Sequence, residues 1–125
     1  MAVLKKKSKK PGSKNQRKVF WEERARLMRL ISHPVRLLIL EALSKGSRCV
    51  KDLNSMVDIE QPNFSQHMAV LRKAKLVGCQ KSGALRCYYI MRPSLVRQLI
   101  QILSEEHEIL VRSRDSVVRE AKWPR

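Results

Sequence analysis

Hydrophobic residues recur every three to four positions along most of this chain, and in one short region they alternate with polar residues. The helical spacing predicts helices over five segments, at about 16–31, 34–45, 50–57, 61–75 and 93–122. Two strands, 77–81 and 86–90, flank Ser82-Gly83-Ala84 and predict a β-hairpin with a glycine at its turn. The expected order is therefore four helices, a hairpin and one long final helix.

The fourth of these helices has one apolar face and one polar face. Phe64, Met68 and Leu71 fall at i, i+4 and i+7, and Pro62 suits the first turn of a helix. The other face carries hydrogen-bonding and basic side chains, namely Asn63, Ser65, Gln66, Arg72 and Lys73. Such a helix suits the major groove of DNA, although an ordinary amphipathic surface helix shows the same pattern.

The neighbouring segments favour the DNA-binding alternative. A short helix and a brief turn precede this helix, which is the arrangement of a helix-turn-helix. Lys81 and Arg86 near the hairpin tip suggest a wing that reaches the sugar-phosphate backbone. We therefore predict a mainly α winged helix-turn-helix (α/β, order ααααββα). The last helix is apolar on more than one side, which predicts a homodimer through the N- and C-terminal helices.

The positive charge of the chain extends beyond its N-terminal end. The 125 residues carry a net charge of +16, and residues 1–18 hold eight basic side chains and no acidic one. The remaining residues hold 19 basic and 11 acidic side chains, so the body is also basic and favours a polyanionic partner. We expect residues 1–15 to be a disordered basic arm, either a phosphate-contacting or a solubilising segment, and 16–122 to form one domain.

Several classes of protein are disfavoured. No apolar run approaches the roughly 18 residues of a membrane span, and no apolar segment follows the basic start as in a secretory signal. Three cysteines without an export signal indicate cytoplasmic thiols and not a disulfide framework. We find no nucleophile–base pair, phosphate-cradling glycine loop or metal-ligand cluster, so we do not expect an enzyme.

The chain resembles the ArsR/SmtB family of winged-helix repressors from about Leu27 to Leu103. The resemblance lies in the runs Ser32–Leu40 and Gln61–Arg72 and in Tyr88-Tyr89. It implies a homodimeric transcriptional regulator, usually a repressor, that binds an inverted-repeat operator in double-stranded DNA. Members commonly release DNA on binding a metal or metalloid, or on thiol modification.

By position, the resemblance places polar side chains of the recognition helix at base edges or nearby phosphates. The implied DNA-binding residues are Gln61, Pro62, Asn63, Ser65, Gln66, His67 and Arg72, with Lys81 and Arg86 on the wing. Lys75 stands where the family usually has a glycine after this helix, so we expect that helix end to be capped differently. The wing carries one extra residue between Gly83 and the tyrosines.

The sensor chemistry is less well defined. The run Cys49-Val50-Lys51-Asp52-Leu53 matches the arsenic-binding segment of the family, but a lysine replaces one thiolate, which argues against that site. Of a second, zinc-binding set only His107 remains. Cys49, at a helix start between cations, is a candidate reactive thiol or a small buried residue.

Cys79 and Cys87 would oppose each other if the hairpin turn centred on Gly83. They could then form a disulfide, bind a soft metal or metalloid with a third ligand, or simply pack within the strands. A regulator without a small effector is also possible. The rival from another class is a sequence-neutral nucleic-acid packaging protein, which polar residues on the recognition helix disfavour because packaging needs only charge and DNA deformation.

Overall fold

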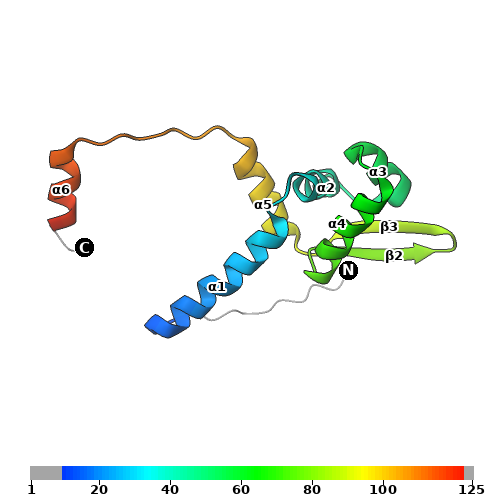
Figure 1. Cartoon of the computed structure of the whole chain (residues 1–125), viewed down its shortest axis with the longest axis horizontal. Coiled ribbons are helices and arrows are strands. Elements are labelled where there is room, and N and C mark those ends of the chain that lie inside the picture. The colour runs from blue at the N-terminus through cyan, green and yellow to red at the C-terminus, as the bar shows by residue number, and fades with distance from the viewer. Residues whose placement is uncertain (1–9, 123–125) are drawn as a thin grey trace.

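A computed structural model describes residues 10–122 of the chain (Figure 1). Its elements are α1 (Lys14–Ile31), α2 (Pro34–Ser44), β1 (Arg48–Cys49), α3 (Val50–Val57), α4 (Gln61–Lys73), β2 (Val77–Ser82), β3 (Leu85–Ile90), α5 (Pro93–Ser104) and α6 (Arg114–Lys122). The predicted winged helix-turn-helix order is confirmed. Two features were not predicted: the short strand β1 and the division of the last helix into α5 and α6.

A capping box sets the start of α1. The Ser13 hydroxyl accepts from the Gln16 backbone N–H, and the Gln16 side chain accepts from the Ser13 N–H. Both interactions satisfy backbone groups that a helix start leaves unpaired. The helix therefore begins at Lys14, two residues before the expected start, while residues 1–9 of the predicted arm lie outside the described residues.

The core is built around α2, which contacts α3, α4, α5 and β3. Ile39 and Leu40 of α2 have no exposed surface, and Val96 of α5 is almost completely buried. From α4, the predicted stripe of Phe64, Met68 and Leu71 enters this core. Burial of large apolar side chains stabilises a fold by about 1.5–3 kcal/mol each, so the core holds α4 firmly.

The carboxyl end of α4 differs from the expectation drawn from Lys75. Leu76 N–H donates to the Leu71 carbonyl and Lys75 N–H donates to the Arg72 carbonyl, which together make a Schellman motif. Lys75 occupies the left-handed position of that motif with φ 57°. The expectation of a different cap is therefore wrong, because a lysine adopts the conformation for which glycine is favoured.

The three strands form an antiparallel sheet in the order β1-β3-β2, and β2 and β3 extend from the body as the wing (Figure 1). A two-residue turn, Gly83-Ala84, joins them, and Ser82 pairs with Leu85. Because the turn has two central residues and is not centred on Gly83, the predicted pairing of Cys79 with Cys87 is wrong. Cys79 lies opposite Tyr88, and Cys87 lies opposite Gln80 on β2 and Cys49 on β1.

The prediction of one long helix from Pro93 to about Lys122 is also wrong. α5 ends at Ser104, where the Ser104 hydroxyl donates to the Ile100 carbonyl and the His107 ring Nε2 lies 2.6 Å from the Ile102 carbonyl. Glu105, Glu106 and Glu108 follow directly, and negative charges at the carboxyl end of a helix oppose the helix dipole. The chain therefore leaves the helix and runs extended to residue 113.

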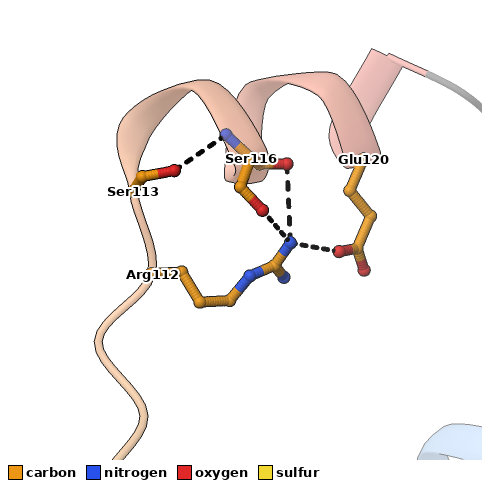
Figure 2. A network of polar contacts seen from close by, with 4 residues as sticks. All are labelled: Arg112, Ser113, Ser116 and Glu120. Carbon is orange, nitrogen blue, oxygen red and sulfur yellow. Dashed lines mark hydrogen bonds and ion pairs between the residues drawn. The ribbon is translucent and has the colours of Figure 1, made fainter.

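α6 is held by local polar contacts at the far end of this extended segment (Figures 1 and 2). The Ser113 hydroxyl accepts from the Ser116 N–H, and Arg112 donates to Ser116 and forms an ion pair with Glu120 at 2.6 Å (Figure 2). The apolar run before α6 is open to solvent, since the side chain of Ile109 is 92% exposed. Leu110 falls within the helix predicted over 93–122 but lies outside any helix in the structure.

Candidate nucleic-acid interface

The exposed face of α4 is polar and the opposite face is anchored. Gln61, Pro62, Asn63, Ser65 and Gln66 are all exposed. On the other side, Phe64, Met68 and Leu71 are at most 2% exposed. This division arises because the apolar residues repeat at helical spacing while the residues between them are polar. The result is a rigid helix that presents amide and hydroxyl groups to solvent.

Gln61 connects α4 to the preceding helix. Its Oε1 accepts from Asn54 Nδ2 of α3 at 3.1 Å, and its Nε2 lies 3.5 Å from the Ser65 hydroxyl, one turn further along α4. These contacts orient the start of α4 relative to α3. Among the predicted contact residues, Gln66 is exposed and its side chain makes no hydrogen bond within residues 10–122, which leaves its side-chain amide available to a ligand.

His67 is turned toward α2. Its ring packs against the ring of His33 with centroids 4.3 Å apart, and its Nδ1 accepts from Arg36 Nε at 3.2 Å. Arg36 also donates to the Leu30 carbonyl of α1, and His33 caps α2 by accepting from the Val35 N–H. This His33–Arg36–His67 cluster joins α4 to the start of α2 and the end of α1.

The cluster favours the neutral form of His67. Burial lowers the pKa of His67 below its ordinary value of 6.5, and the neighbouring charges of His33 and Arg36 add smaller effects in the same direction. A protonated ring could not accept the Arg36 hydrogen bond. The folded protein therefore takes up the His67 proton at lower pH than the unfolded chain does.

We expect acid to destabilise the fold through His67. The pKa of His67 in the folded protein lies below 6.5. The contribution of neutral His67 to the free energy of unfolding is therefore fully present above that pH and is lost as the pH falls through the folded pKa. Denaturant unfolding between pH 5 and 8 should show a steeper loss below 6.5 for the wild type than for His67→Gln. Parallel pH profiles for the two proteins would exclude His67 as the source.

The wing and the end of α4 supply positive charge. Lys81 and Arg86 are paired in register across β2 and β3, so their side chains extend from the same face of the wing, and both are exposed. Arg72 and Lys73 in the last turn of α4 are exposed as well. One basic pair thus lies on the wing and the other lies on α4. Phosphate contacts on either side of a groove would require such a separation.

The cysteines do not form a metal cluster. Cys49, Cys79 and Cys87 are all free thiols of intermediate burial. Within residues 10–122 no group of three or more His, Cys, Asp or Glu side chains is placed to hold a metal ion. The third ligand that a soft-metal site at Cys79 and Cys87 would require is therefore not found in this part of the chain.

Comparison with known proteins decides the family. Residues 33–78 match the family model described as "Bacterial regulatory protein, arsR family". An HTH-type transcriptional regulator of Methanocaldococcus jannaschii is 33% identical over 86 residues, which cover 68% of this chain and 96% of that protein. The chain belongs to the ArsR family. It is accordingly a transcriptional regulator and not an enzyme.

Named repressors and solved structures are also similar to this chain. The biofilm growth-associated repressor of Agrobacterium fabrum is 33% identical over 65% of this chain and 68% of its own. The crystal structure of the transcriptional repressor BigR from Xylella fastidiosa superposes with a TM-score of 0.64, at 28% identity, over 76% of this chain and all of that one. A homodimeric winged helix-turn-helix DNA-binding domain from Mycobacterium bovis shares the fold, with a TM-score of 0.62 at 21% identity. The match covers 78% of this chain and 98% of that domain.

Sequence reasoning located the exposed residues of this ArsR protein but missed its internal contacts. The Asn54–Gln61 and Arg36–His67 hydrogen bonds were not predicted. The role of His33 as the N-cap of α2 could have been inferred from the sequence. The residue is polar and stands just before Pro34, which begins a helix that needs a cap. None of the helices within residues 10–122 combines the length and the hydropathy needed to cross a membrane.

Proposed function

We propose that this ArsR protein is a homodimeric, sequence-specific DNA-binding repressor of the cytoplasm that recognises an inverted-repeat operator. The observation that carries the proposal is the exposed polar edge of α4 above a fully buried apolar stripe, with the basic wing beside it. Relatives that are named repressors support the proposal. Direct base contacts would come from Asn63, Ser65 and Gln66, with Gln61 and Pro62 at the start of the helix.

The remaining predicted residues divide between contact and support. Arg72, Lys81 and Arg86 would supply the phosphate contacts, and the lysine-rich residues 1–15, outside the domain formed by 16–122, would act as a solubilising segment. His67 would support DNA binding without contacting DNA. Its ring contacts His33 and Arg36, and these contacts hold α4 in place.

Exposed apolar residues on the terminal helices support the homodimer. Trp21 of α1 is 64% exposed, and Ile102 and Leu103 at the end of α5 are more than half exposed. Apolar surface of this kind is usually covered by a partner, and a two-fold dimer covers the same patch on both copies. The dimer would place two α4 helices in successive major grooves about one DNA turn apart.

The release signal belongs to the same proposal. Metal or metalloid capture needs several converging soft ligands, and the described residues offer no group of three or more. Thiol modification requires only accessible cysteines and is the alternative that the structure favours. A regulator without a small effector, and a sequence-neutral packaging protein, are the competing possibilities.

Selection of bound duplexes from a random DNA pool tests the function. We expect enrichment of one inverted-repeat sequence whose half-sites lie about 10–11 base pairs apart, which follows from two-fold symmetry and the pitch of DNA. A packaging protein would retain the pool without enrichment. Recovery of a single unrepeated half-site would contradict the dimer while leaving sequence-specific binding intact.

A further inference from the structure

Cys49 and Cys87 are directly opposed in the sheet. They are register partners on the antiparallel strands β1 and β3, so their side chains extend from the same face. Tyr88, the neighbour of Cys87, is 5% exposed and faces the core. Because side chains alternate along a strand, the two thiols lie on the outer face of the sheet. Both are free and half-buried.

The spacing of such a pair is close to that of a disulfide. Directly opposed residues of an antiparallel pair have Cβ atoms about 4.5–5.5 Å apart, and a disulfide needs about 3.5–4.5 Å. A shift of roughly 1 Å would join the two sulfurs. β1 can supply that shift, because it has two residues and lies at the edge of the sheet. Cys79 has no such partner, since it lies opposite Tyr88 and packs against the core.

We propose that Cys49 and Cys87 form a reversible intramolecular disulfide on reaction with a hydroperoxide. One thiolate attacks the peroxide O–O bond, becomes a sulfenic acid and releases an alcohol, or water from hydrogen peroxide. The second thiol then attacks that sulfur and releases water as the S–S bond forms. Two electrons pass from the two thiols to the peroxide, and reduction by a dithiol returns both thiols.

The disulfide would connect two parts of the DNA-binding surface, a consequence that rests on the proposed function. β1 leads directly into α3, the first helix of the helix-turn-helix, and β3 is a strand of the wing. Drawing β1 and β3 together shifts the wing relative to α3 and α4. The wing and α4 must contact the duplex at the same time, so oxidation weakens operator binding. The expected loss is about fivefold or more, which is the lower end of usual allosteric couplings.

The test oxidises the full-length protein with hydrogen peroxide, in the wild type and in Cys49→Ser, Cys87→Ser and Cys79→Ser. Peptide mapping by mass spectrometry locates any disulfide, and binding to the selected operator is titrated before oxidation, after it and after dithiothreitol. We expect a Cys49–Cys87 link in the wild type and in Cys79→Ser, weaker operator binding in both, and full recovery on reduction. Cys49→Ser and Cys87→Ser should keep their affinity.

The two readouts separate this inference from the proposed function. A link that involves Cys79, a link between chains, or no link would overturn the disulfide whatever the protein binds. An intact link with unchanged operator affinity would overturn its regulatory effect. Failure of the reduced protein to prefer any DNA sequence would instead refute the proposed function, and the mapped link would still decide the modification site.

Discussion

Raising the salt concentration from 50 to 200 mM should weaken operator binding by about 10³-fold. Arg72, Lys81 and Arg86 are exposed on the proposed DNA face of each protomer, so a dimer would make about six phosphate contacts. Each contact releases condensed counterions, and six contacts give a slope of log affinity against log salt of about −5. Titrations by fluorescence anisotropy at four or five salt concentrations measure this slope.

A double variant identifies the groups responsible. Lys81→Ala with Arg86→Ala removes four contacts from a dimer and should reduce the slope to about −2, with similar losses on operator and random DNA. Lys45→Ala is the matched control, because Lys45 is an exposed lysine at the end of α2, outside α4 and the wing. A slope that does not respond to the wing variant would show that the wing does not contact phosphate.

The parts of the candidate interface that follow from local periodicity were predictable. Phe64, Met68 and Leu71 are buried and the polar residues between them are exposed, because helical spacing alone decides which side of α4 each occupies. The hairpin and its basic tip followed from the same kind of pattern. These features need no knowledge of residues far away in the chain.

The features that the sequence did not reveal depend on geometry between elements or on helix ends. One residue in the turn decides whether Cys87 faces Cys79 or Gln80, and strand β1 is too short to show any alternation. The break after Ser104 results from charges and side-chain hydrogen bonds at a helix end, which apolar periodicity does not report. Arg36 and His67 are 31 residues apart, so their contact arises only in the fold.

Replacing Gln66 by alanine should reduce discrimination between operator and random DNA. Gln66 is exposed on α4, one residue from Ser65, and its amide could donate to and accept from one base edge. A bidentate contact of this kind contributes about 1–3 kcal/mol of discrimination. Gln98→Ala is the control, because Gln98 is an exposed glutamine on α5 whose hydrogen-bond partner is Ser94 in the same helix.

The central claim is that α4 reads the DNA sequence. The dissociation constant for random duplex divided by that for the operator, both at one fixed salt concentration, tests it most directly. For Gln66→Ala we expect this ratio to fall about 5- to 150-fold, while random-DNA affinity and the Gln98→Ala ratio stay at the wild-type value. Equal losses on operator and random DNA would contradict the claim, because they would mean that Gln66 contributes to general binding without reading a base.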